Sequence, residues 1–120
     1  MKPTWGNPAN KYRNKKVQVD GIWFDSKKES RIYGELKLLK ASGEIVGFEL
    51  QKVFELIPAQ RGEDGKVIER ACTYRADFVV TYPDGEVSVI DAKGSRGLDQ
   101  KWPIKRKLML YLHKIRVKEV

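Results

Sequence analysis

The chain has 120 residues, which is enough for one domain with a modest core but not for two. Its 24 Lys and Arg residues against 16 Asp and Glu leave a net charge of +8, which favours a polyanionic partner such as nucleic acid. One cysteine and one histidine argue against a disulfide, a structural zinc site and histidine-based nuclease chemistry, and no apolar run approaches the roughly 18 residues of a membrane span. We therefore expect a cytoplasmic protein without a membrane partner.

Residues 1–16 are rich in Pro, Gly and Asn, and they contain five basic residues and no acidic one. This composition predicts a flexible basic arm that precedes a domain spanning residues 17–120. Two roles are open for the arm, a solubilising tail or a contact to phosphates. Its candidate phosphate contacts are Lys11, Arg13, Lys15 and Lys16.

The first structured elements are a hairpin and a helix. Val17 to Phe24 reads as a strand or hairpin that turns at Asp20-Gly21. Ser26-Lys27-Lys28-Glu29 is a capping box, so we expect a helix from Ser26 to about Ser42-Gly43. Its inward stripe consists of Ile32, Leu36 and Leu39, with Tyr33 alongside.

The remaining elements are strands with one further helix. Alternating apolar residues predict strands over residues 48–57, 71–82 and 86–93. Pro103 suits the first turn of a second helix that runs to about His113, and residues 115–120 form a last strand. We expect Trp102, Met109 and Tyr111 in the core. The order is helix, three strands, helix, strand, which is an α/β fold.

Two aspartates are predicted to face each other on neighbouring strands. If the turn closes over Pro83, Asp84 and Gly85, counting back along both strands sets Asp77 opposite Asp91. Opposed side chains lie about 4.5 to 5.5 Å apart at Cβ, so two carboxylates repel unless a cation compensates. The pattern therefore predicts a metal ion, with Lys93 on the same strand face as Asp91. The alternative is a surface salt bridge between Lys93 and Asp91, with Asp77 solvated.

Glu29 offers a third carboxylate. It precedes Ile32 and Leu36 by three and seven residues, so it lies at the head of the inward stripe of its helix, and Glu35 borders the same stripe as a second choice. A glutamate at the edge of a core needs a partner, which the predicted metal ion would supply. The alternative is that Glu29 only completes the capping box with Ser26. The two roles are compatible.

The expected cofactor is Mg²⁺, with Mn²⁺ as a substitute, because both ions prefer carboxylate and water oxygens. Basic residues around the second helix are candidate phosphate contacts. Lys105 lies at the head of an inward stripe with Leu108 and Leu112 and is assigned to the scissile or an adjacent phosphate. Arg96, Lys101 and Lys107 are assigned to flanking phosphates. The alternative for this basic run is a solvated helix face.

Several motifs together resemble a known family. They are Tyr12-Arg13-Asn14-Lys15-Lys16, Asp20-Gly21-Ile22-Trp23-Phe24-Asp25-Ser26-Lys27-Lys28-Glu29, Gln51, Phe54-Glu55-Leu56, Tyr74-Arg75-Ala76-Asp77-Phe78, Asp91-Ala92-Lys93-Gly94 and Lys105-Arg106-Lys107. From Tyr12 onward the chain is similar to a small phage-encoded family of unknown function. That family resembles the PD-(D/E)xK nucleases, and among them the phage endonuclease I type of Holliday junction resolvase. The resemblance implies a restriction-endonuclease-like core with a mixed sheet.

The resemblance also implies roles for individual residues. Asp77 becomes a metal ligand, Asp91 the second acid, Lys93 the catalytic lysine and Glu29 the helix acid, whereas Gln51 matches a family glutamine without an evident role. The chain departs from the commonest pattern at Ala76, which replaces a proline, and at Asp91, which replaces a glutamate.

The implied function is a Mg²⁺-dependent DNA endonuclease of a phage or prophage, active in the host cytoplasm on branched DNA during recombination. An enzyme that resolves a junction must cut two strands, and the junction has twofold symmetry, so we expect a homodimer with one active site in each copy. Two alternatives stay open, a nuclease without structure selectivity or of restriction type, and a basic nucleic-acid-binding module that does not cleave.

Overall fold

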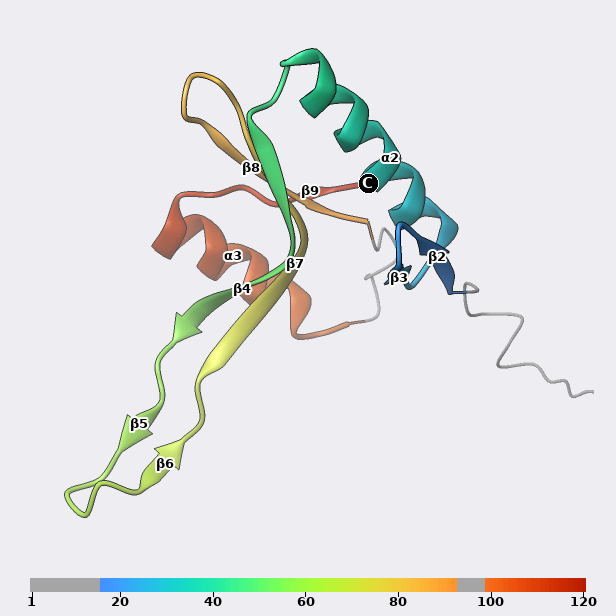
Figure 1. The fold of residues 1–120 in the computed structure, drawn as a ribbon. Coiled ribbons are helices and arrows are strands. Elements are labelled where there is room, and N and C mark those ends of the chain that lie inside the picture. Colours follow the sequence, from blue (N-terminus) through green and yellow to red (C-terminus); the bar gives the residue numbers. More distant parts are fainter. Residues whose placement is uncertain (1–15, 93–98) are drawn as a thin grey trace, which may run out of the picture. The chain divides into compact units, whose positions relative to one another are not determined.

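The structure is a computed structural model that describes residues 16–92 and 99–120. The described residues divide into two compact units at Ser42 and Gly43, residues 16–42 in the first and residues 43–92 with 99–120 in the second, and each unit is described separately (Figure 1). No helix among the described residues is both long and apolar enough to cross a membrane.

The first unit contains a small hairpin followed by a helix. Strands β2 (Val17–Val19) and β3 (Ile22–Phe24) pair antiparallel, with Val19 opposite Ile22. Asp20 and Gly21 form the turn with φ values of +54° and +78°, and two consecutive positive φ angles are typical of a type I′ turn. This turn confirms the predicted reversal at Asp20-Gly21.

Helix α2 (Lys27–Ser42) confirms the predicted first helix and its capping box. Ser26 Oγ accepts a hydrogen bond from the Glu29 N–H at 3.1 Å, and Glu29 Oε2 accepts one from the Asp25 N–H at 2.9 Å. Gly43 ends the helix with φ of +82°, a conformation that glycine adopts without steric cost. Of the predicted inward stripe, Leu36 is buried together with Tyr33, whereas Ile32 and Leu39 are half-buried.

A polar cluster joins the hairpin turn to α2. The Tyr33 hydroxyl donates to Asp20 Oδ2 at 2.9 Å, and the Lys37 ammonium forms a salt bridge with the same oxygen. The hydrogen bond from Lys37, followed by that from Tyr33, lowers the pKa of the Asp20 carboxyl below its ordinary value of 3.8. The Tyr33 ring also packs on Phe24, with ring centroids 5.0 Å apart. These contacts tie the hairpin to the helix.

The second unit is a four-stranded mixed sheet with one helix (Figure 1). The strand order is β4 (Gly47–Ile57), β7 (Cys72–Thr81), β8 (Val87–Asp91) and β9 (Lys118–Glu119). Strand β7 pairs antiparallel with both β4 and β8, whereas β9 runs parallel to β8. The three predicted strands and the last one are therefore present, although the last is short. This arrangement agrees with an α/β fold.

The hairpin between β7 and β8 has the predicted register. The Tyr82 N–H donates to the Glu86 carbonyl at 2.9 Å, and the loop between these residues contains Pro83, Asp84 and Gly85. Ladder pairs continue to Phe78 opposite Ile90. One further step in this register sets Asp77 opposite Asp91, at the end of β8.

Helix α3 (Trp102–His113) begins one residue before Pro103 and ends at the predicted residue. Trp102 and Met109 are buried in a core with Leu56, Tyr74, Ala76, Val79, Val89 and Val117. The prediction for Tyr111 was wrong, because its side chain is 73% exposed. Residues two positions apart on a helix are separated by about 200° around its axis, so Tyr111 faces away from Met109. The fully buried residues of the helix are Trp102 and Met109. Of the predicted inward leucines, Leu108 is half-buried and packs against this core, whereas Leu112 is exposed.

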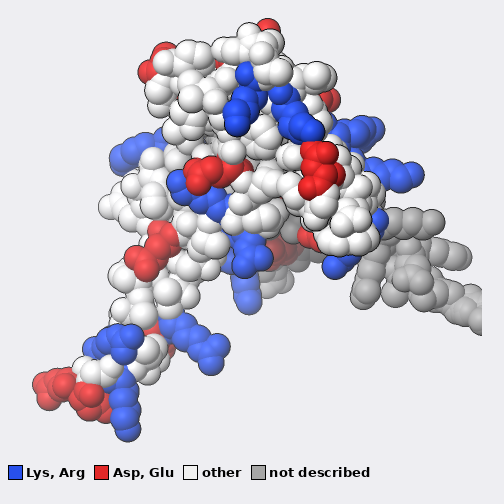
Figure 2. All heavy atoms as spheres, in the orientation of Figure 1, with Lys and Arg blue, Asp and Glu red and all other residues white. Residues whose placement is uncertain are grey.

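A thin hairpin extends the β4–β7 pair beyond the sheet (Figure 1). It contains β5 (Gln60–Arg61) and β6 (Val67–Glu69), and its turn includes Glu63, Asp64 and Gly65. We call residues 58–71 the β5–β6 arm. Figure 2 shows acidic side chains at the end of this arm with basic ones beside them.

Candidate active site

The candidate site is centred on two buried aspartates of neighbouring strands. Asp77 lies on β7 with 2% of its surface exposed, and Asp91 ends β8 with 0% exposed. An isolated carboxylate is costly to bury, so each must be hydrogen-bonded or close to a positive charge. This burial argues against the alternative in which Asp77 is a solvated acid.

Asp77 accepts hydrogen bonds from the strands on both sides of it. The Ala92 N–H, which follows β8, donates to Asp77 Oδ2 at 2.9 Å. The Gln51 amide, on β4, donates from Nε2 to Asp77 Oδ1 at 3.3 Å. Donors from two neighbouring strands therefore hold the carboxylate in one orientation. No role for Gln51 was evident from the sequence. Its hydrogen bond to Asp77 now places it in the candidate site.

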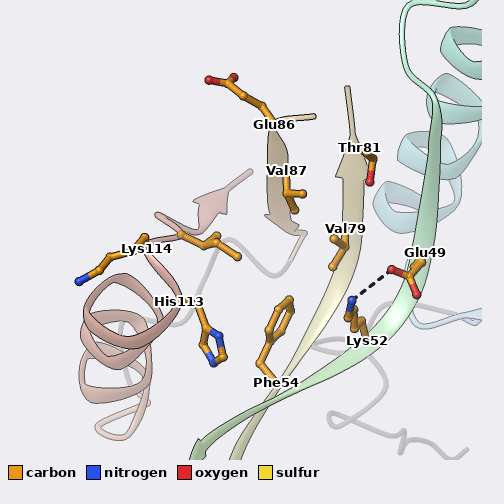
Figure 3. A pocket seen from close by; sticks show the side chains of 10 residues that line it. Glu49, Lys52, Phe54, Val79, Thr81, Glu86, Val87, His113 and Lys114 are labelled. Atoms are coloured by element: carbon orange, nitrogen blue, oxygen red, sulfur yellow. Dashed lines mark hydrogen bonds and ion pairs between the residues drawn. The ribbon is translucent and has the colours of Figure 1, made fainter. Parts of the chain in front are cut away.

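Gln51 has an uncommon backbone conformation for its residue type. Its φ is +54°, a region that costs roughly 1–2 kcal/mol for residues other than glycine. The conformation reverses the alternation of side chains along β4, since Glu49 and Lys52 form a salt bridge at 3.3 Å on one face although they are three residues apart (Figure 3). Backbone strain concentrates at functional sites, so this outlier supports a role for Gln51 beyond strand pairing.

Asp91 is held from within the core. The Tyr74 hydroxyl donates to Asp91 Oδ2 at 2.9 Å, in a buried bond between β7 and β8. Tyr74 packs on Trp102 at the start of α3, with ring centroids 5.3 Å apart, and Trp102 Nε1 donates to Glu119 Oε1 at 3.0 Å. Glu119 is the parallel partner of Asp91 in β9. A continuous set of contacts thus links the Asp91 carboxylate to the basic helix.

The donor set fits a hard divalent cation. Within residues 16–92 and 99–120, no three His, Cys, Asp or Glu side chains form a ready metal cluster. The second unit instead supplies the two carboxylates of Asp77 and Asp91. Mg²⁺ commonly binds through one or two carboxylates and keeps several waters, and each carboxylate offers about four lone-pair sites, so hydrogen bonding and metal coordination are compatible.

The other predicted site residues are distributed as follows. Glu29 belongs to the first unit, where it is buried and forms the capping contacts described above, whereas Glu35 is exposed. On and before α3, Lys101 and Lys107 are exposed and Lys105 is half-buried, and Lys16 is exposed in the first unit. The helix contains three Lys or Arg residues and no acidic one, which suits contact with phosphates. Outside the described residues lie Lys11, Arg13, Lys15, Lys93 and Arg96.

A separate open hollow of about 620 Å³ lies against β4, β7 and β8, near the end of α3 (Figure 3). Its lining includes Glu49, Lys52, Phe54, Glu86, His113 and Lys114. Much of its polar surface is already paired, since Lys52 bonds to Glu49 and His113 Nε2 lies 2.9 Å from the Glu55 carbonyl. Neither Asp77 nor Asp91 lines it, so it is distinct from the candidate active site.

Comparison with protein-family models matches residues 9–119 to a family described as a protein of unknown function, DUF1064. Neither the curated proteins nor the solved structures contain a match.

Proposed function

The chain belongs to the DUF1064 family, and we propose that it is a metal-dependent DNA endonuclease of the PD-(D/E)xK type that hydrolyses phosphodiester bonds. The observation that carries the proposal is the pair of buried aspartates on adjacent strands, each held by its own hydrogen-bond donors. Replacing buried charged groups by apolar residues of similar size is often neutral or stabilising. A buried pair of like charges is therefore better explained by a function than by folding.

In the proposed mechanism, Asp77 and Asp91 would hold Mg²⁺ or Mn²⁺. When bound there, the ion would supply Lewis-acid chemistry for phosphate polarisation and for lowering the pKa of the attacking water. Gln51 and the Ala92 N–H fix the orientation of Asp77, and Tyr74 fixes that of Asp91. Preorganised ligands lower the cost of assembling the transition state.

Two further assignments come from the resemblance and stay predictions. Lys93, two residues after Asp91 in the sequence, orients the attacking water or stabilises negative charge on the phosphorane. Glu29 is the helix acid of the superfamily pattern. The basic residues of α3 and of the N-terminal arm hold flanking phosphates, so binding should weaken steeply as salt is raised.

The proposed substrate is branched DNA, in particular a four-way junction, which the enzyme cuts as a homodimer in the cytoplasm of a phage-infected or lysogenic host. The test is cleavage of junction, flap and linear DNA with and without Mg²⁺. Asp77→Asn and Asp91→Asn should each abolish cleavage and leave DNA binding intact or tighter, because each removes a metal ligand and a negative charge near phosphate.

The outcomes of this assay separate the alternatives. Equal cleavage of junction and linear DNA favours a nuclease without structure selectivity. Binding without cleavage in Mg²⁺ or Mn²⁺ favours a non-catalytic basic module. Turnover of either variant within about tenfold of the wild type removes the metal-site proposal, because loss of a ligand should cost far more.

A further inference from the structure

The β5–β6 arm exposes apolar side chains on a two-stranded ribbon. Every residue of 58–71 is exposed except Gly62, which is half-buried. Ile68 is 68% exposed and Val67 46% exposed. Ile68 is also the extra residue of a β-bulge, since Gln60 pairs with Glu69 and Arg61 with Val67. An isolated two-stranded ribbon is marginal in water, so this arm gains stability if another surface covers it.

The charge of the arm differs from that of the chain. The chain carries a net charge of +8, which opposes association of two copies. The arm contains three basic residues (Arg61, Lys66 and Arg70) and three acidic residues (Glu63, Asp64 and Glu69), so its net charge is zero. Self-association through the arm therefore avoids close contact between the basic surfaces of two copies.

The charges are also ordered along the arm. The outer part, with Glu63, Asp64 and Lys66, carries net −1, and the inner part, with Arg61, Glu69 and Arg70, carries net +1. Val67 and Ile68, whose side chains are exposed, belong to β6. This strand lies between the turn and the inner end of the arm (Figure 1). Two such arms placed antiparallel about a twofold axis would match negative with positive ends and bring the apolar residues together.

We infer that the β5–β6 arm is a dimerisation surface whose partner is the same arm of a second copy of this chain. The inference deepens the proposed nuclease function, because a dimer brings two active sites to one branched substrate. The arm is small, so we expect a dissociation constant in the micromolar range, and DNA that binds both copies should tighten the dimer.

The oligomeric state of the full chain tests the inference by sedimentation velocity over a micromolar concentration range, without DNA. Ile68→Ser should weaken the dimer by about thirtyfold or more, as expected for a central apolar contact. Val87→Ser, which removes an exposed apolar side chain on β8 outside the arm, is the matched control and should not change the dimer. At protein concentrations well below the dissociation constant, where both proteins are monomeric, the Ile68 variant should melt at the same temperature as the wild type, because the exposed side chain contributes little to the monomer core.

A charge swap tests the antiparallel geometry independently. Arg70→Glu alone, or Glu63→Lys with Asp64→Lys, should each weaken the dimer by placing like charges at both ends. The triple variant that combines Glu63→Lys, Asp64→Lys and Arg70→Glu restores opposite charges at the two ends of the arm, so it should recover most of the wild-type association. A triple variant no better than its parents overturns the antiparallel arm pairing.

Three other outcomes are equally informative. A wild-type chain that stays monomeric but cleaves DNA in Mg²⁺ overturns the arm inference and leaves the nuclease proposal standing. A dimer that is lost on Ile68→Ser, in a protein that cleaves no DNA, supports the arm inference and removes the nuclease proposal. A monomer whose DNA binding falls on Ile68→Ser identifies the arm as a DNA contact and overturns the inference.

Discussion

Neutralising Asp91 should stabilise the metal-free protein, although the residue is completely buried and hydrogen-bonded. Two carboxylates about 5 Å apart repel by about 3 kcal/mol at an effective dielectric constant of about 20. Asp91→Asn removes this repulsion but turns a charge-assisted bond from Tyr74 into a neutral one, at a cost of about 1 kcal/mol. The net gain in unfolding free energy is then about 2 kcal/mol, or roughly 5–10 °C in melting temperature.

Bound metal should reverse this order of stability. A ligand present at about 100 times its dissociation constant stabilises the folded state by about 2.7 kcal/mol, and the variant should lose most of this gain together with a metal ligand. Thermal melts in a chelator and in excess Mg²⁺ measure both effects. Asp84→Asn is the matched control, because this exposed aspartate lies in the turn between the same two strands and an asparagine retains the acceptor for the Glu86 N–H. The reasoning fails if Asp91→Asn lowers the melting temperature in chelator, or if Mg²⁺ stabilises variant and wild type equally.

Three further perturbations test the parts of the structure separately. Tyr74→Phe should lower cleavage about tenfold to a hundredfold, with a partial rescue at high Mg²⁺, because it removes the donor to Asp91 but no metal ligand; a rate within twofold of wild type contradicts the positioning role. Gln51→Asn introduces a residue that tolerates positive φ but has a shorter side chain, which withdraws the amide from Asp77. Cleavage should therefore fall about tenfold while the melting temperature is unchanged or higher; a loss of stability without loss of rate would make Gln51 a structural residue. Because folding lowers the pKa of Asp20, the stability that Asp20 contributes is present above pH 3.8 and is lost as the pH falls through its folded pKa; melting temperatures of wild type and Asp20→Asn should therefore converge in acid, and a constant difference down to the lowest measurable pH refutes this.

Local patterns in the sequence predicted the two helices, the strands of the main sheet and the register of the central hairpin, but not the short strands β5 and β6 of the arm. Turn residues set the loop of Pro83, Asp84 and Gly85, and a period of two then determined which residue faces Asp77. The capping box around Ser26 likewise placed the start of α2. Each of these predictions depends on residues close together in the sequence, so hydrogen-bond geometry and side-chain periodicity decide the outcome.

Contacts between distant residues were not accessible in the same way. The bond from Tyr74 to Asp91 joins residues 17 apart, and that from Gln51 to Asp77 joins residues 26 apart. The positive φ of Gln51 has no local signal, because glutamine ordinarily avoids that region. Tyr111 was misplaced for a related reason, since which face of α3 turns inward depends on the packing of Trp102 against Tyr74. Tertiary packing decided each of these features.

The position of the aspartates in the sheet gives a physical reason to expect chemistry there. Strand β7 lies between β4 and β8, so Asp77 has a strand on either side, and each of these sides supplies one of its donors. A site on central strands is held more rigidly than one on loops, and rigid ligands are what catalysis by positioning requires. The same rigidity prevents two like charges from moving apart, so we expect the arrangement to lower the stability of the fold when no cation is bound. Proteins tolerate such a cost where activity depends on it, so the response of the melting temperature to Mg²⁺ tests the proposed metal site, and the cleavage assay tests the proposed activity.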